Sequence, residues 1–144
     1  AESLAFFKAS SVAPRHEGKT VLGADTIAVV ADEIIGKPVD REDARRILRK
    51  LSGTTHRVIT GVALLKPESG HRLMRHSTST IRVRPLSDEA IERYLDSGQW
   101  QGKAGAYGIQ EKADPFVENL EGSFTNVVGM PMELIADLFS EWVN

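Results

Sequence analysis

The chain has 144 residues, with 18 basic and 20 acidic side chains, and its formal net charge of −2 argues against a protein that mainly coats nucleic acid or acidic membranes. Apolar residues make up 41% of the sequence, which is enough for one packed domain and argues against wholesale disorder. The absence of cysteine excludes disulfide scaffolds, thiolate metal sites and a cysteine nucleophile.

The first half of the chain carries alternating helix and strand signals. Apolar spacing predicts a helix over residues 2–13, which stops before Pro14. Residues 21–30 are β-branched and apolar on both faces, which is typical of a buried central strand. Asp40 is a good N-cap for a following amphipathic helix, and Gly53 ends that helix.

The second half contains a predicted hairpin, with strands over residues 56–65 and 73–83 around a turn at 67–70. The segment 99–110 is too rich in glycine to be regular structure throughout. The remaining predicted elements are a helix capped by Ser87, a short strand over 116–120 and a final helix from Pro131. This order predicts one α/β domain with a mixed, twisted sheet and flanking helices.

Asp25 is the clearest anomaly in the sequence. It lies within ten nearly apolar residues, where a carboxylate is costly to bury unless it is paired. An aspartate at a strand end, bonded to a loop amide, would explain it without any function. The apolar setting favours a functional role instead, either as a general base or as a metal ligand.

Two lysines and a glycine-rich loop are candidates for binding an anionic ligand. Lys37 lies between glycine and proline, in a loop that can hold an ammonium group against a phosphate, although a solvated loop lysine has the same pattern. Lys8 lies among apolar residues, a pattern that slightly favours a lysine merely extending along its helix. Residues 102–110 form a loop of the kind that wraps ligands, and the Gln110 amide can both donate and accept toward a base edge.

Several blocks, in order along the chain, resemble the Maf family of nucleoside triphosphate pyrophosphatases. They are Gly23-Ala24-Asp25-Thr26, Gly36-Lys37-Pro38, residues 51–56, residues 60–64, residues 102–110 and residues 121–131. The resemblance implies a mixed α/β sheet with a cleft between two lobes, similar to the inosine triphosphate pyrophosphatases. It also implies hydrolysis of a nucleoside triphosphate to the monophosphate and pyrophosphate with Mg²⁺ or Mn²⁺.

The resemblance assigns roles to five residues. Asp25 corresponds to the catalytic acidic residue and metal ligand, Lys37 to a phosphate-binding lysine and Lys8 to a substrate-binding lysine at the cleft. Thr26 and Gln110 correspond to positions associated with base selection. The blocks around them are similar to the branch of the family that acts on dTTP and UTP, and they imply a homodimer.

The chain departs from the family pattern at its front. Residues 1–144 are expected to form a single Maf-like domain without the family's opening strand and Ser-x-Arg-Arg phosphate loop, and an incomplete chain explains this better than a degenerate member. The resemblance also implies an alternative function, a nucleotide-binding regulator of cell division and septum formation with little turnover.

Other partners and locations are not favoured by the sequence. The arginines between residues 72 and 84 have no interleaved aromatic platform for nucleic acid, and no apolar run is long enough to span a bilayer. We therefore expect a cytoplasmic protein that binds neither nucleic acid nor membrane.

Overall fold

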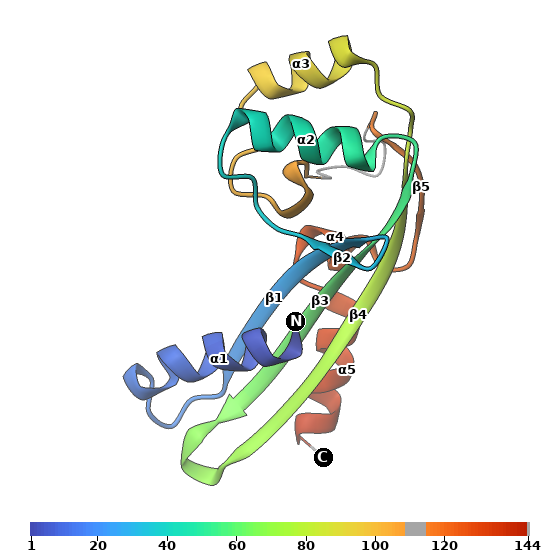
Figure 1. Cartoon of the computed structure of the whole chain (residues 1–144). Coiled ribbons are helices and arrows are strands. Elements are labelled where there is room, and N and C mark those ends of the chain that lie inside the picture. The colour runs from blue at the N-terminus through green and yellow to red at the C-terminus, as the bar shows by residue number, and fades with distance from the viewer. Residues whose placement is uncertain (109–114, 144) are drawn as a thin grey trace.

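A computed structural model of the chain describes residues 1–108 and 115–143 (Figure 1). The described strands form one antiparallel sheet in the order β2-β1-β3-β4-β5. The strands are β1 (Val21–Val30), β2 (Glu33–Ile35), β3 (Thr55–Lys66), β4 (His71–Val83) and β5 (Val117–Glu121). The helices are α1 (Glu2–Val12), α2 (Arg41–Leu51), α3 (Asp88–Asp96), α4 (Phe124–Val128) and α5 (Met132–Val143), with 3-10 turns η1 (Ala13–Arg15), η2 (Pro67–Ser69) and η3 (Ala104–Ala106).

The helix ends follow the signals in the sequence. The Asp40 side chain accepts a hydrogen bond from the Asp43 main-chain N–H at 2.8 Å and so caps α2. Ser87 caps α3 in the same way, because its hydroxyl accepts from the Ala90 N–H at 3.1 Å. Both predicted caps are confirmed.

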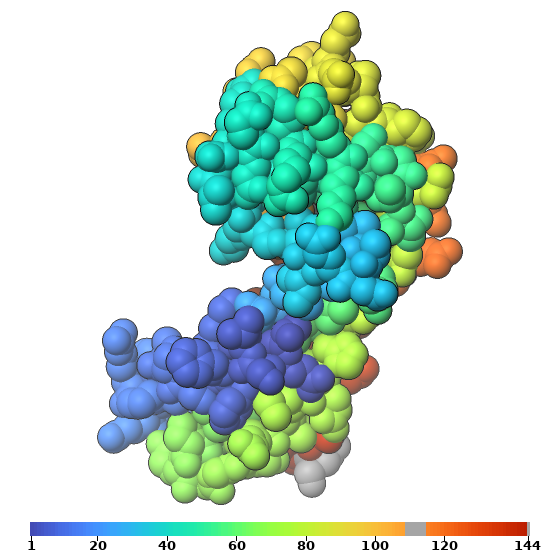
Figure 2. All heavy atoms as spheres, in the orientation of Figure 1, coloured from blue at the N-terminus to red at the C-terminus, as the bar shows by residue number. Residues whose placement is uncertain are grey.

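The long strands β3 and β4 join two lobes (Figure 1). In one lobe, α2, α3 and η3 enclose the largest apolar cluster, which includes Ile47, Leu51 and Ile81. In the other lobe, α1 packs on one side of the strands, and α5 packs against β3 through Ile135 and Leu138. The surface is deeply hollowed between the lobes (Figure 2). The expected two-lobed α/β fold with a cleft is confirmed.

The strand pairing differs in one respect from the predicted mixed sheet, because every pair of described strands is antiparallel. The cause is β2, which lies where the sequence predicts only a turn at Asp32-Glu33 and a break at Gly36-Lys37-Pro38. This short strand forms a hairpin with β1, so the chain has already reversed before α2 leads it to β3. Consequently β2 and β3 run in the same direction on opposite sides of β1 and do not pair. None of the described helices is long and apolar enough to cross a membrane.

Candidate active site

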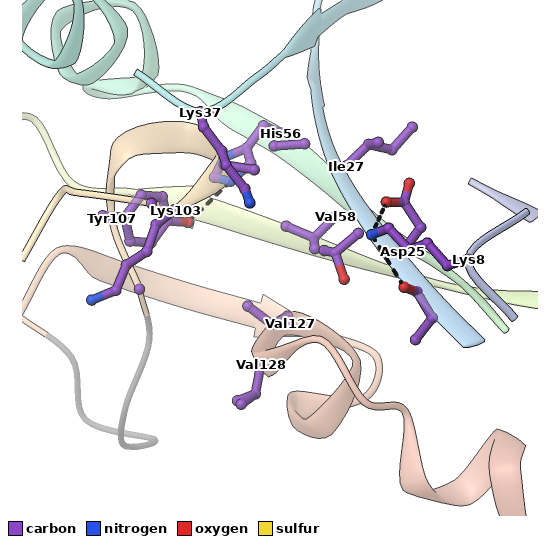
Figure 3. Close-up of a pocket in the computed structure, with 16 residues that line it drawn as sticks. Lys8, Asp25, Ile27, Lys37, His56, Val58, Lys103, Tyr107, Val127 and Val128 are labelled. Carbon is purple, nitrogen blue, oxygen red and sulfur yellow. Dashed lines mark hydrogen bonds and ion pairs between the residues drawn. The ribbon is translucent and has the colours of Figure 1, made fainter. Parts of the chain in front are cut away.

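A cleft of about 460 Å³ lies between the two lobes (Figure 3). It is lined by α1, the middle of β1, the connection from β2 to α2, the start of β3, the glycine-rich loop over 102–108 and α4. Asp25 and Lys8 lie at one end of the cleft, and Tyr107 and Lys103 lie at the other (Figure 3). Segments from across the sequence therefore meet at one concave surface.

The position of β1 explains why neighbouring residues of one strand can both line the cleft. β2 pairs only with Ala28–Val30, so the preceding part of β1 has no described strand on that side. Successive side chains of a strand point to opposite faces of the sheet, and here the cleft extends around the unpaired edge, because the consecutive residues 24–28 all line it. Asp25 and Thr26 both line the cleft for this reason.

Lys8 contacts Asp25 because α1 packs unusually close to the sheet. An added Cβ on Gly23 would lie 2.3 Å from the Ala5 carbonyl oxygen, so only glycine permits this approach. The Lys8 ammonium then lies 2.6 Å from Asp25 Oδ1 and 3.4 Å from the Ala24 carbonyl oxygen (Figure 3). The sequence pattern slightly favoured a lysine without a specific contact, and the structure gives it one.

The two oxygens of Asp25 have different environments. Its side chain is 12% exposed, and Lys8 contacts only Oδ1. Oδ2 is buried and has no hydrogen-bond partner among the described residues. Burying a carboxylate oxygen without a hydrogen-bond donor has a free-energy cost. This oxygen is therefore suited to contact a bound cation, a water molecule or a ligand group.

The cleft is rich in positive charge. Lys37 lines it from the β2–α2 connection, as the sequence predicted for a binding lysine, and Lys103 lines it from the glycine-rich loop. Lys103 is not among the binding residues predicted from the sequence. Together with Lys8, these lysines give the described lining three positive charges against the single negative charge of Asp25. A lining with this balance attracts a polyanion.

His56 and Tyr107 form a second contact that sequence reasoning missed. His56 Nε2 and the Tyr107 hydroxyl lie 3.0 Å apart, and the rings meet edge to face. His56 is only 2% exposed, and burial lowers its pKa to about 4, so the imidazole is neutral near pH 7. The glycine-rich loop is also held by Gly105, whose N–H donates to the Gly36 carbonyl oxygen at 3.3 Å. The loop and the Lys37 segment thus form one wall of the cleft.

The described residues of the cleft can supply only part of the ligand set of a divalent cation, so the bound nucleotide and water would have to supply the rest. Nowhere in ranges 1–108 and 115–143 do three or more His, Cys, Asp or Glu side chains lie together as a metal site. Asp25 offers one buried oxygen without a partner. Mg²⁺ is commonly held by one or two carboxylates together with substrate phosphates and water. The donor set therefore suits a cation that enters with a phosphorylated ligand.

Four of the five residues selected from the sequence line this one cleft: Lys8, Asp25, Thr26 and Lys37. Gln110, the fifth, lies outside the described residues. The segment before it is described as far as Gly108 and lines the cleft.

Comparison with known proteins gives a family and a set of close relatives. A family model described as "Maf-like protein" matches residues 1–142. A dTTP/UTP pyrophosphatase from Ruminiclostridium cellulolyticum is 42% identical over 141 residues, which cover 98% of this chain and 73% of the relative. Those from Geobacter sulfurreducens (49% identical; 96% and 73% covered) and Alkaliphilus metalliredigens (48% identical; 91% and 68% covered) have the same name.

Proposed function

Because this chain belongs to the Maf-like protein family, we propose that it hydrolyses nucleoside triphosphates to the monophosphate and pyrophosphate, with dTTP and UTP as preferred substrates. The observation that carries the proposal is the gathering of Lys8, Lys37 and Lys103 around one buried carboxylate in a single cleft. Its volume of about 460 Å³ lies within the range of small-molecule sites.

In the proposed mechanism, water attacks phosphorus and the bridging P–O bond to pyrophosphate breaks. Asp25 orients the water or accepts its proton, and Lys8 holds the carboxylate in place through Oδ1. Lys37 neutralises the negative charge that grows on the leaving pyrophosphate. Phosphoryl transfer depends mainly on such positioning and charge stabilisation. A cleft with one carboxylate and several lysines therefore has the types of group that this reaction needs.

We propose that a divalent cation, Mg²⁺ or Mn²⁺, serves as the cofactor and that Asp25 Oδ2 is its protein ligand. When bound, the cation neutralises charge on the phosphate oxygens. Oδ2 is suited to this role because it is buried and has no donor among the described residues. The remaining ligands would be phosphate oxygens and water.

We propose that Thr26 and Gln110 select the base, the role that the family resemblance gives them. The Gln110 amide can pair with the O4 acceptor and the N3–H donor of uracil or thymine in one bidentate contact. Thr26 lines the cleft beside the catalytic carboxylate. A lost bidentate base contact costs about 1–3 kcal/mol, so Gln110→Ala should narrow the preference for dTTP and UTP by that amount.

Pyrophosphate release from a panel of nucleotides tests the proposal directly. We expect turnover of dTTP and UTP with Mg²⁺ or Mn²⁺ at higher kcat/KM than the purine triphosphates. Tight nucleotide binding without pyrophosphate release would favour the alternative, a nucleotide-binding regulator. A clear preference for 7-methyl-GTP over UTP would contradict the proposed substrate class. Asp25→Asn serves as the inactive control.

A further inference from the structure

A chain of buried hydroxyl and amide groups runs from the cleft through the sheet to α4. The buried polar side chains among the described residues are His56, Thr60, Ser79 and Asn126. Thr60, Ser79 and Asn126 belong to this series of hydrogen-bonded groups. Thr26 Oγ1 lies 2.9 Å from Thr60 Oγ1, and Thr60 Oγ1 lies 2.9 Å from the main-chain carbonyl oxygen of Asn126. Thr26 is the member of the chain that borders the cleft.

The direction of the hydrogen bonds in this chain is fixed. A carbonyl oxygen can only accept, so the single hydroxyl proton of Thr60 must point to Asn126. Thr60 Oγ1 can then only accept in its contact with Thr26, which makes the Thr26 hydroxyl the donor. The proton of Thr26 is therefore committed to the interior of the protein, and only its lone pairs remain for a ligand.

The side chain of Asn126 anchors the residue whose main-chain carbonyl accepts from Thr60. The Asn126 amide nitrogen donates to the Val58 carbonyl oxygen at 3.0 Å and to Ser79 Oγ at 2.9 Å, which sets the orientation of the amide. Ser79 in turn donates to the Ser123 carbonyl oxygen at 2.8 Å. Thr60 and Asn126 are both 0% exposed, so water has no access to replace either partner.

The same bonds position α4, which lines the cleft through Val127 and Val128 (Figure 3). The helix ends at Gly129, whose φ is +109°, and an added Cβ there would lie 3.4 Å from Thr26 Oγ1. Thr26 thus lies between Thr60 and the end of α4.

We propose that Thr60 and Asn126 are positioning residues that make Thr26 an obligate hydrogen-bond acceptor toward the nucleotide. The inference rests on the proposed function and deepens it. The site then selects a substrate that presents an N–H or O–H donor at this point and rejects one that presents a lone pair. Two such donors are common to dTTP and UTP, namely the 3′-hydroxyl of the sugar and the N3–H of the base, which Thr26 would then share with Gln110.

Substrate analogues combined with Thr26→Val test the proposal and distinguish the two donors. N3-methyl-dTTP lacks the base donor, and 3′-fluoro-3′-deoxy-dTTP replaces the sugar hydroxyl with an atom that cannot donate. For the wild-type protein we expect kcat/KM to fall about tenfold with one of these analogues. With dTTP as substrate, Thr26→Val should lower kcat/KM by about the same factor. With the analogue to which the wild-type protein is sensitive, Thr26→Val should cause no further fall in kcat/KM. If the effect of Thr26→Val is equal on all three nucleotides, the proposal is wrong.

Thr60→Val tests the positioning role, because it removes the acceptor of the Thr26 proton while keeping the side-chain shape. Discrimination is the ratio of kcat/KM for dTTP to kcat/KM for the analogue that lowers it in the wild-type protein. We expect Thr60→Val to lower this ratio several-fold and Thr60→Ser to restore it. Thr78→Val on the neighbouring strand β4 is the matched control and should leave discrimination unchanged, because Thr78 is exposed. A folded Thr60→Val protein with full discrimination would overturn the proposal.

Two further measurements keep these tests decisive. If Thr60→Val does not fold, the Thr26→Val comparison decides by itself. If the wild-type protein releases no pyrophosphate from dTTP, the proposed function fails. The dissociation constants of dTTP and the two analogues, measured by calorimetry, then test the acceptor role of Thr26 separately. Equal dissociation constants for all three in the wild-type protein would contradict it.

Discussion

Asp25 has one oxygen paired with Lys8 and one buried oxygen without a partner in the described structure. Asp25→Asn keeps the shape of the side chain but removes its charge and basicity. We expect kcat to fall by at least about 100-fold, the usual scale for loss of a general base. Pyrophosphate release under saturating dTTP measures the loss.

Thermal unfolding separates this catalytic effect from a structural one. The Lys8 side chain is half-exposed, so water can replace Asp25 as the partner of its ammonium group, and a neutral amide costs less to bury at position 25 than a carboxylate does. The melting temperature of Asp25→Asn should therefore stay close to that of the wild-type protein. Turnover near the wild-type rate by the folded variant would remove Asp25 from the mechanism.

His56 gives the protein a pH-dependent stability. Its pKa is about 4 in the folded chain against an ordinary value of 6.5, because burial disfavours the charged form. The unfolded state therefore binds a proton at a higher pH than the folded state. The full contribution of His56 to the free energy of unfolding is present above pH 6.5. As the pH drops toward 4, this contribution is lost, by about 3 kcal/mol in total at about 1.4 kcal/mol per pKa unit.

Denaturant unfolding between pH 7 and 4.5 checks the contribution of His56. Glu92, whose pKa is lowered to about 2 mainly by a hydrogen bond from Arg45, loses its contribution only below about pH 4.5. His56→Gln keeps a polar group near Tyr107 but cannot titrate in this range. The wild-type free energy of unfolding should drop across the window while that of His56→Gln stays nearly flat. Parallel curves for the two proteins would contradict this account.

At the scale of single residues, what could be predicted depended on local sequence. Asp25 stands out because a carboxylate within an apolar strand is anomalous without reference to any other part of the chain. The contact of Lys8 with Asp25 depends on how closely α1 packs at Gly23, which no helical periodicity reveals. His56 and Tyr107 are 51 positions apart, and only the fold brings them together.

At the scale of elements, the long segments with strong caps and periodicity were predicted, and the short ones were not. β2 follows a hairpin turn of Ala31 and Asp32, with φ values of +48° and +63°, and it was missed because it is short. The sequence indicates a turn at Asp32-Glu33 and a break at Gly36-Lys37-Pro38, and the few residues between them are too short a run to show the alternation of a strand. The helix α4 has only five residues, and it is stabilised by the Ser123 cap and the buried Asn126 rather than by amphipathic spacing.

The glycine-rich loop provides a prediction about an element. Gly105 has φ +78°, and an added Cβ would make only ordinary contacts, so Gly105→Ala introduces backbone strain without a clash. We expect a loss of about 1 kcal/mol in the free energy of unfolding. Because the strain shifts the loop that carries Lys103 and Tyr107, KM for dTTP should rise several-fold. Steady-state kinetics and denaturant unfolding measure the two effects.

Gly70→Ala is the matched control for this loop. Gly70 has a similar φ of +67° and open space around it, but it lies in the turn between β3 and β4 and does not line the cleft. The two variants should lose similar stability, and only Gly105→Ala should change KM. An equal change in KM for both would mean that general destabilisation, rather than loop position, controls binding.

At the scale of the whole molecule, the two lobes provide different parts of one binding surface. The lobe of α1 brings Lys8 to Asp25, and the lobe of α2 and η3 brings Lys37 and Lys103 (Figure 1). Three positive charges around one negative charge repel each other until an anion enters. A triphosphate that spans the cleft therefore relieves this repulsion and links the lobes, so binding should stabilise the fold.

This coupling gives a prediction about the metal. Because Asp25 is the one carboxylate in the described lining of the cleft, Mg²⁺ alone should bind weakly and raise the melting temperature little. A non-hydrolysable dTTP analogue alone should raise the melting temperature through the lysines. Together they should raise it by more than the sum of the separate shifts, because each ligand completes the site of the other and their coupling is reciprocal. Thermal unfolding with each ligand, both and neither measures the coupling, and Asp25→Asn should remove the excess while retaining the shift from the nucleotide alone. An equally large shift with Mg²⁺ alone would show that the protein holds the cation without the nucleotide.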